Sequence, residues 1–308
     1  MYQRWIISGL SILLSIVVAA CSNVAISQPQ QTATSTATIS QQQAPKESAK
    51  RVVALTPLSA DIIYRLDPTK LIGIASSSVL NKDSRFQDIP SVAQGRTQPN
   101  LEKIVALKPD LVIGASGFSD QTLQRLDQLK INTYSTKIDS WKSLEELTIT
   151  LAQKIGASPQ SLLNKYQQLL TQDNSTSKNI SKNNTSTLVM VSRQPILTPN
   201  KNSWAGDMLN QFQIKNIAAY LQGKSPIGGY VTLSPEKILE ANPETIILVN
   251  TPQTSSEQEV IDGFRKEPFW QKLQATKNNR VYVFDYLGLV NPGSIDAIEK
   301  AAEKLQQL

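Results

Sequence analysis

The stretch LEKIVALKPDLVIGA at residues 101–115 decides the fold. Its first seven residues have the apolar spacing of a helix. The run after Pro109 is continuously apolar, as in a strand buried on both faces. The stretch PEKILEANPETIIL at residues 235–248 repeats the order of helix, proline-acid pair and strand. This internal repeat predicts two similar lobes with a cleft between them, where small molecules usually bind.

Strands alternate with helices on both sides of these two stretches. Short apolar runs predict strands at 51–55, 71–75, 110–115, 131–135, 187–192, 245–250 and 280–284. Helical patterns lie between them, near 61–66, 101–107, 121–129, 203–212, 268–274 and 292–308. The alternation predicts an α/β fold with mostly parallel sheets that helices cover on both faces.

Start and stop signals of helices divide the chain. Ser143, with Glu146 three residues later, predicts a capping box at a helix start, and Gly156 predicts the end of that helix. Pro159 begins a second helix, and Pro292 begins the last one. The predicted divisions are an N-terminal lobe at 51–141, a helical segment at 142–174, a polar loop at 175–186 and a C-terminal lobe at 187–308.

The first 50 residues have the features of an export and anchoring segment. After Arg4, residues 5–20 form an apolar run shorter than the ~20 residues that span a bilayer, which is typical of an export signal. The run ends in Val-Ala-Ala-Cys, which looks like a bacterial lipobox and contains the single cysteine, Cys21. We predict a lipoprotein signal peptide at 1–20, a lipid on Cys21 and a disordered tether at 21–50. The alternative is a signal peptide followed by an incidental cysteine.

Composition excludes several chemistries. The chain has 308 residues, no histidine and one cysteine. It therefore has no Ser-His-Asp triad, no Cys-His pair, no imidazole metal ligand and no internal disulfide, and we expect no metal site. Its 31 Lys and Arg against 25 Asp and Glu give a formal charge of +6, which is too diffuse to indicate a nucleic-acid partner.

Most of residues 51–308 resembles the substrate-binding lipoproteins of ABC importers for iron-siderophores, cobalamin and heme. The resemblance rests on RVVALTPLSADIIYRL (51–66), GRTQPNLEKIVALKPDLVI (95–113) and GGYVTLSPEKILEANPETIIL (228–248). It implies two lobes joined by a single long bridging helix with little hinge motion, and residues 159–173 fit that helix. The phrase GRTQPNLE at 95–102 is closer to the hydroxamate-siderophore branch.

The resemblance also implies a docking role for two glutamates. In these proteins one acidic residue on each lobe meets arginines of the two permease subunits, and Glu102 and Glu236 match those motif positions. Carboxylates pair well with guanidinium groups. The alternative is structural, because the helix dipole stabilises a carboxylate in the first turn of a helix. The symmetric placement on two lobes favours docking.

Arg96 is the first candidate for ligand contact. In the similar branch an arginine six residues before this glutamate faces the ligand, and here it would donate to the negatively charged oxygens of a chelate. The alternative is a solvated loop arginine. Phe118 would cover the apolar face of the chelate. Tyr230 lies in the matching loop of the second lobe, but the branch has a tryptophan near here and this chain has glycine at the closest position. That departure leaves the pocket chemistry open.

Four further candidates lie at predicted strand-to-helix turns, which border the ligand crevice in α/β sheets. They are Trp141, Arg193, Trp204 and Tyr286. For Arg193 and Tyr286 the alternative is an ordinary surface position. Trp141 and Trp204 can equally be core anchors, because tryptophan is usually largely buried.

We therefore predict a monomeric substrate-binding lipoprotein, exported and lipid-anchored to a bacterial membrane, facing the periplasm or the cell exterior. It would capture a ferric siderophore of hydroxamate or citrate type and deliver it to an ABC permease dimer with its ATPase. Iron would arrive already chelated, so we expect no cofactor. The first alternative is a cobalamin or heme binding protein of the same importer class.

Two hypotheses belong to other classes. A membrane-tethered hydrolase would use carboxylates such as Asp139 or Asp285 as acid and base. No nucleophile elbow or phosphate-binding glycine loop accompanies them, so we expect no enzyme. A non-transport surface lipoprotein would bind a protein and need no small-molecule pocket, and the symmetry of Glu102 and Glu236 argues against it.

Overall fold

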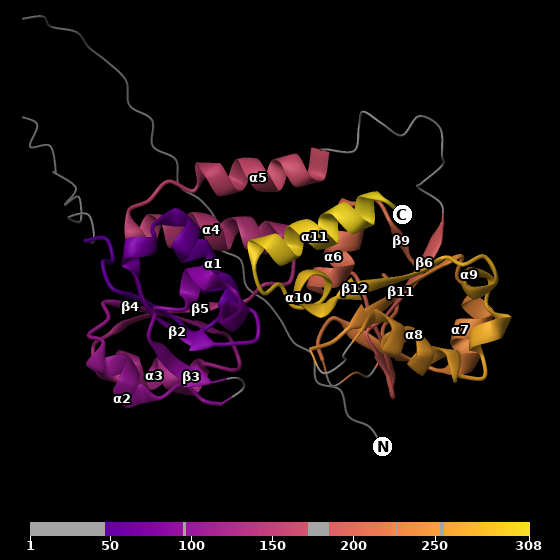
Figure 1. Ribbon diagram of the computed structural model, residues 1–308, viewed down its shortest axis with the longest axis horizontal. Coiled ribbons are helices and arrows are strands. Elements are labelled where there is room, and N and C mark those ends of the chain that lie inside the picture. The colour runs from indigo at the N-terminus through magenta and orange to yellow at the C-terminus, as the bar shows by residue number, and fades with distance from the viewer. Residues whose placement is uncertain (1–46, 95–96, 172–184, 224, 226, 253–255) are drawn as a thin grey trace, which may run out of the picture. The chain divides into compact units, whose positions relative to one another are not determined.

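The structure is a computed structural model that describes residues 47–94, 97–171, 185–223, 225, 227–252 and 256–308 (Figure 1). The predicted signal peptide, Cys21, most of the predicted tether and Arg96 lie outside these residues. Most of the predicted polar loop at 175–186 also lies outside them.

The N-terminal lobe contains a five-stranded parallel sheet in the order β3-β2-β1-β4-β5. Its strands are β1 (Val52–Ala54), β2 (Leu71–Ser76), β3 (Ser91–Gln94), β4 (Leu111–Ala115) and β5 (Asn132–Thr136). All of β1 and nearly all of β4 is buried, which explains why their sequences are continuously apolar. The strand order reverses between β1 and β4, so the carboxyl ends of these two strands border a crevice.

Capping side chains start the helices of the N-terminal lobe. The Thr56 hydroxyl accepts a hydrogen bond from the Ser59 amide at 3.2 Å, and the Asn100 side chain accepts one from the Lys103 amide at 2.9 Å. The helices are α1 (Pro57–Leu66), α2 (Leu101–Ala106) and α3 (Asp120–Gln128), with the short 3-10 turns η1 (Pro68–Lys70), η2 (Leu80–Lys82) and η3 (Ser84–Phe86).

The C-terminal lobe contains two sheets. A four-stranded parallel sheet has the order β12-β11-β6-β9. A three-stranded antiparallel sheet has the order β10-β8-β7. The strands are β6 (Ser186–Met190), β7 (Ser192–Arg193), β8 (Ile196–Pro199), β9 (Lys215–Asn216), β10 (Tyr230–Leu233), β11 (Thr245–Asn250) and β12 (Val281–Asp285). The two-lobed α/β fold with mostly parallel sheets is thus confirmed, and the small antiparallel sheet is an addition that the sequence did not predict.

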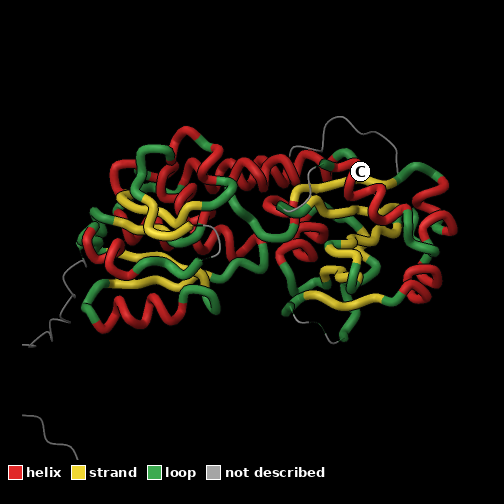
Figure 2. The backbone as a smooth tube through the Cα atoms, turned by 60° about the horizontal axis from the view of Figure 1, so that its bottom comes forward, coloured by secondary structure: helices red, strands yellow, loops and turns green. Residues whose placement is uncertain are grey.

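Short helices surround these sheets (Figure 2). They are α6 (Trp204–Gln211), α7 (Pro235–Ala241), α8 (Glu257–Arg265), the 3-10 turn η5 (Trp270–Lys272), α9 (Gln274–Lys277), α10 (Tyr286–Leu289) and α11 (Ile295–Gln306). The prediction that Pro292 begins the last helix is wrong. Ser294 is the capping residue, and its hydroxyl accepts from the Ala297 amide at 3.2 Å.

Two antiparallel helices lie between the lobes in the sequence, α4 (Trp141–Ile155) and α5 (Gln160–Thr171) (Figure 1). Helix α4 contacts both α1 and α6, and α5 contacts both α4 and α11. The helix expected at 159–173 is therefore one of a pair that links the lobes. The prediction that Ser143 starts this helix is wrong. Ser140 is the capping residue, and Ser143 is the third helical residue, which completes the capping box. Gly156 ends α4 with a φ of 72°, as predicted.

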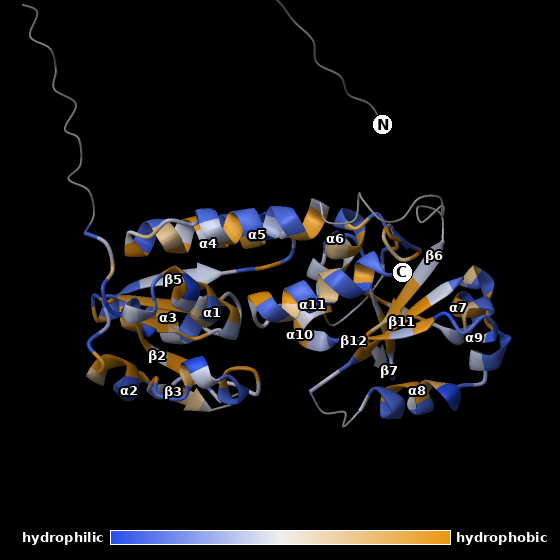
Figure 3. Cartoon of the chain, turned by 45° about the horizontal axis from the view of Figure 1, so that its top comes forward, coloured by the Kyte–Doolittle hydropathy of each residue, from blue (hydrophilic) through white to orange (hydrophobic). Residues whose placement is uncertain are grey.

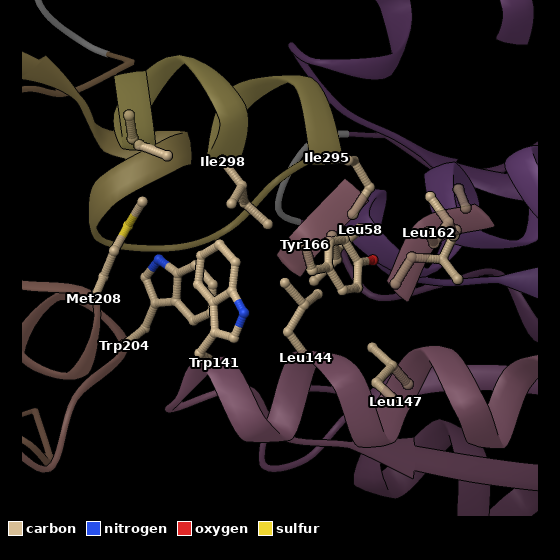
Figure 4. Close-up of a cluster of buried hydrophobic side chains, with 14 of the residues drawn as sticks. Leu58, Trp141, Leu144, Leu147, Leu162, Tyr166, Trp204, Met208, Ile295 and Ile298 are labelled. Carbon is tan, nitrogen blue, oxygen red and sulfur yellow. The ribbon is translucent and has the colours of Figure 1, made fainter. Parts of the chain in front are cut away.

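One hydrophobic core extends from the N-terminal lobe through the helix pair into the C-terminal lobe. Trp141 of α4 stacks on Trp204 of α6 with ring centroids 6.0 Å apart, and Tyr166 of α5 meets Trp141 edge-on at 6.2 Å (Figure 4). Hydrophilic and hydrophobic residues mix along α4, α5 and α11, whereas β11 is mostly hydrophobic (Figure 3). Within the described residues, no helix combines the length and the hydropathy needed to cross a membrane.

Candidate ligand-binding site

A cavity of about 800 Å³ lies between residues of the two lobes. The N-terminal lobe contributes the segment Ser78–Ser84, which follows β2. The C-terminal lobe contributes Asn250 and Asp285 from the ends of β11 and β12, together with one side of α11. Its size is within the ~300–1,000 Å³ of small-molecule sites, and the carboxyl ends of parallel strands are where open α/β sheets bind ligands. This cavity is the candidate ligand site.

Most carboxylates that line this cavity are already ion-paired. Asp83 lies 2.6 Å from Arg85, and Asp296 lies 2.7 Å from Arg65. The hydrogen bond from Arg85 holds the pKa of Asp83 below its ordinary value. Asp285 instead accepts a hydrogen bond from the Leu287 amide at 2.7 Å and thereby caps α10. These contacts hold the carboxylates in place in the cavity wall.

Arg193 lines a second cavity, of about 690 Å³, which shares Thr251 with the first. Its Nη1 donates to the carbonyl of Gly263 at 2.8 Å, and its Nε lies 3.7 Å from Glu267. The guanidinium is thus already bound to α8 and the turn after it. The structure places Arg193 beside the candidate site, in a neighbouring cavity.

Tyr230 and Tyr286 both belong to the C-terminal lobe, where they begin β10 and α10. Tyr230 begins β10 and is 8% exposed, and Tyr286 is half-buried between Asp285 and Leu287, which both line the first cavity. Burial raises the pKa of the Tyr230 phenol, and the phenol of Tyr286 raises it further. Neither tyrosine lines the cavity of about 800 Å³.

Trp141 and Trp204 lie in the core. Their side chains are 2% and 3% exposed, and the Trp204 indole donates to the carbonyl of Gly288 at 2.9 Å. The Trp141 indole nitrogen is buried and has no hydrogen-bond partner among the described residues. Their stacking and burial favour the alternative role of core anchors over direct ligand contact.

Phe118 is an exposed aromatic residue after β4. Its side chain is 48% exposed, and it follows Gly117, which has a φ of +83°. An exposed ring at the end of a central strand is available to a ligand, although Phe118 does not line the cavity of about 800 Å³. Arg96 lies outside the described residues, so its role stays a prediction.

Glu102 and Glu236 occupy equivalent places in the two lobes. Each is the second residue of a short helix, α2 or α7, and each is exposed. A hydrogen bond from the capping residue Ser234 lowers the pKa of Glu236. Both carboxylates are accessible to a partner.

The residues that connect the lobes beside the cavity were not predicted from the sequence. Asp61 is fully buried, and it contacts Arg65, Arg85 and the amide of Ile295. The helical spacing of Asp61 and Arg65 was a visible signal. The hydrogen bond from the Ile295 amide to Asp61 had no such signal, because the two residues are 234 positions apart and nothing local indicates that α11 starts against α1. No group of three or more His, Cys, Asp or Glu in the described part of the chain is arranged to hold a metal ion.

Two α/β lobes with a cavity at the carboxyl ends of their strands have the arrangement in which open α/β sheets bind small molecules. The chain belongs to the periplasmic binding protein family, whose sequence profile matches residues 52–286. Members of this family are substrate-binding transport proteins and not enzymes.

Individual relatives agree with this assignment. The ABC transporter substrate-binding lipoprotein YvrC of Bacillus subtilis is 26% identical over 84% of this chain and 81% of its own length. The high-affinity heme uptake system protein IsdE of Staphylococcus aureus is 25% identical over 89% of this chain and 92% of its own. The solved vitamin B12 binding protein BtuF of Vibrio cholerae has a TM-score of 0.62 and 24% identity, over 84% of this chain and 96% of that one. The last similarity shows the fold alone.

Proposed function

We propose that this protein is the lipid-anchored substrate-binding protein of an ABC importer that captures a ferric siderophore of hydroxamate or citrate type. The observation that carries the proposal is the cavity of about 800 Å³ between the lobes of a periplasmic binding protein. The captured chelate passes to a permease dimer that its ATPase drives. YvrC is named as the lipoprotein of such a transporter, which supports the same role for this chain.

The predicted ligand contacts come from both lobes, and those that the structure describes lie outside the lining of the cavity. Arg96 and Phe118 serve the N-terminal lobe, the first by donating to chelate oxygens and the second by covering an apolar face. In the C-terminal lobe, Tyr230 and Tyr286 can donate from their phenols to chelate oxygens. Arg193 lines the neighbouring cavity of about 690 Å³. Trp141 and Trp204 stack on each other and pack α4 against α6.

Docking and anchoring use residues away from the ligand. Glu102 and Glu236 are exposed on opposite lobes and meet arginines of the two permease subunits. Cys21 carries the lipid, and the segment after it tethers the lobes to the membrane surface. The protein therefore works outside the cytoplasm, facing the periplasm or the cell exterior.

Heme is the second candidate ligand. IsdE is named as a heme uptake protein. The specific observation in this chain is that Tyr230 and Tyr286 begin β10 and α10 of the C-terminal lobe, because a tyrosine can ligate heme iron in a protein without histidine. Burial raises the pKa of Tyr230, and a bound ferric iron would have to overcome that effect to bind its phenolate.

Tryptophan fluorescence of a soluble body, residues 45–308, tests the proposed ligand. This body retains Trp141, Trp204 and Trp270. The titrants are a ferric hydroxamate siderophore, ferric citrate, hemin and cobalamin, with the iron-free siderophore as control. Submicromolar binding of a ferric siderophore, without binding of the iron-free form, is the expected result. Binding of hemin or cobalamin alone would retain the transport role and replace the ligand. An absence of binding to all four would contradict the proposal.

A further inference from the structure

Asp61 is a fully buried carboxylate that contacts both lobes. It lies on α1, directly after the central strand β1 of the N-terminal lobe. It accepts hydrogen bonds from Arg65 Nε at 3.0 Å and from the Ile295 amide at 2.7 Å. Ile295 is the first residue of α11 in the C-terminal lobe. One buried side chain thus spans the boundary between the lobes.

Arg85 connects the lobes a second time. Its guanidinium lies 3.0 Å from Asp61, 2.6 Å from Asp83 and 3.2 Å from Asp296 of α11. The rings of Tyr64 and Phe86 lie against it, with centroids 5.6 Å and 5.3 Å from its central carbon. Because a planar guanidinium with several carboxylate partners and flanking rings has little freedom to move, Arg85 is held in one position.

We propose that this interlobe network, Asp61, Arg65, Arg85 and Asp296, sets the spacing of the two lobes around the cavity of about 800 Å³. Asp61 and Arg85 are then positioning residues for ligand capture. Asp296 lines the cavity, whereas Asp61, Arg65 and Arg85 do not. A change at Arg85 therefore moves the cavity walls without removing a ligand contact.

The apolar core between the lobes does not fix their spacing in the same way. Burial of apolar surface is non-directional and tolerates small shifts of one element against another. Hydrogen bonds between charged groups instead require defined distances and directions. The carboxylate of Asp61 is fully buried, and leaving it without hydrogen-bond partners would cost free energy. The lobe spacing at which its partners reach it is therefore favoured.

Variants at Arg85 separate this role from folding. Arg85→Gln removes the links to Asp61, Asp83 and Asp296 but leaves Arg65 to compensate the buried carboxylate. Arg85→Lys keeps the charge but cannot reach three carboxylates with one planar fork, so it should restore the wild-type behaviour only in part. Asp61→Asn is the more severe change, because it leaves two arginines with one partner fewer.

The distance between the lobes is the direct readout. A body of residues 45–308 lacks Cys21 and has no cysteine, so Gln128→Cys on α3 and Lys277→Cys on α9 provide two labelling sites at exposed positions. Pulsed electron paramagnetic resonance should give one narrow distance distribution for the ligand-free protein. Arg85→Gln should broaden or shift it, and Arg85→Lys should broaden it less.

Two control variants separate positioning from charge loss and from lower stability. Arg265→Gln breaks the 3.0 Å pair with Asp262 inside α8, and it should leave the distribution unchanged. Leu126→Ala destabilises the core of the N-terminal lobe away from the network, and it should lower the melting temperature without changing the distribution. An unchanged distribution for both Arg85→Gln and Asp61→Asn would overturn the proposal.

Ligand affinity is the second readout, and it rests on the proposed function. If Arg85→Gln leaves the correct spacing populated about a tenth of the time, the affinity for the ferric hydroxamate falls about tenfold. If the distance distribution changes but the affinity does not, the claim that Asp61 and Arg85 position the lobes for ligand capture is overturned. If the wild-type protein binds no chelate, the proposed function fails, and the distance measurement still decides whether the network positions the lobes.

Discussion

At the scale of single residues, Asp83 couples the cavity wall to a fixed cation. Its carboxylate lies 2.6 Å from Arg85, and it also accepts a hydrogen bond from the Arg85 amide at 3.0 Å. The side-chain bond is the main cause of the lowered pKa of Asp83, and it outweighs the opposing effect of burial. Asp83 therefore stays ionised where an ordinary aspartate begins to gain a proton.

This lowered pKa predicts a pH-dependent contribution to stability. The contribution is fully present above the ordinary aspartate pKa of ~3.9 and is lost as the pH falls through the lower pKa of the folded state. The difference in the free energy of unfolding between wild type and Asp83→Asn should therefore be constant at neutral pH and shrink in acid below ~3.9. Urea unfolding at a series of pH values measures it. A difference of equal size in strong acid and at neutral pH would show that the ion pair is not its origin.

The sequence predicted poorly whether a side chain at a turn points into the core or toward solvent. Trp141, Trp204 and Phe118 all lie at or near the ends of strands or the starts of helices, and all are aromatic. The first two point into the core, and Phe118 is 48% exposed. A turn has no fixed periodicity that tells which side faces the core, so the residue type alone could not separate anchors from ligand contacts.

At the scale of elements, the start of α4 depends on two serines. The Ser140 hydroxyl accepts from the Ser143 amide at 3.2 Å, and the Ser143 hydroxyl accepts from the Ser140 amide at 3.0 Å. This reciprocal pair closes the first turn and starts the helix at Trp141, where the ring enters the core between the lobes. The cap thus fixes both the helix start and the position of a core tryptophan.

Loss of this cap should destabilise the protein. Ser140→Ala removes the acceptor for the Ser143 amide and should lower the free energy of unfolding by about 1 kcal/mol. Urea unfolding provides the measurement. Ser158→Ala is the matched control, because the Ser158 hydroxyl lies 3.4 Å from the Gln160 amide and contributes little. Equal losses in the two variants would contradict the role assigned to Ser140.

The elements that sequence predicted well are those whose burial leaves a strong pattern. The strands at 111–115 and 245–250 are buried almost throughout, so their apolar runs marked both within one residue. The three strands β7, β8 and β10 are short, with two to four residues each. These strands pair with one another and contain no long apolar run, so no local sequence pattern predicted them.

At the scale of the whole molecule, the lobes share a core and an ion-pair network, and each carries one exposed glutamate at an equivalent place. The internal repeat predicted this equivalence, because both helices follow the same sequence pattern. The proposed docking would place one glutamate of each lobe against one permease subunit. The Asp61 contact across the lobes was beyond prediction, since it depends on the tertiary fold.

Docking through both glutamates gives a prediction for transport. The double variant Glu102→Ala/Glu236→Ala should keep its ligand affinity in solution, because neither residue lines the cavity. Uptake by cells that carry the importer should fall, because two carboxylates that pair with permease arginines are lost. Glu240→Ala, which removes another exposed carboxylate of α7, is the control and should leave uptake unchanged. Undiminished uptake by the double variant would refute the docking role.

The most direct test of the central claim is calorimetric titration of the ferric siderophore into wild type and into Ala297→Trp. Ala297 lies on α11 and lines the cavity, so a tryptophan there fills space that the ligand needs. We predict binding of one chelate per wild-type chain and loss of most of that binding in Ala297→Trp, with both proteins folded by circular dichroism. Equal affinity in the two proteins would contradict the claim that the ligand occupies this cavity.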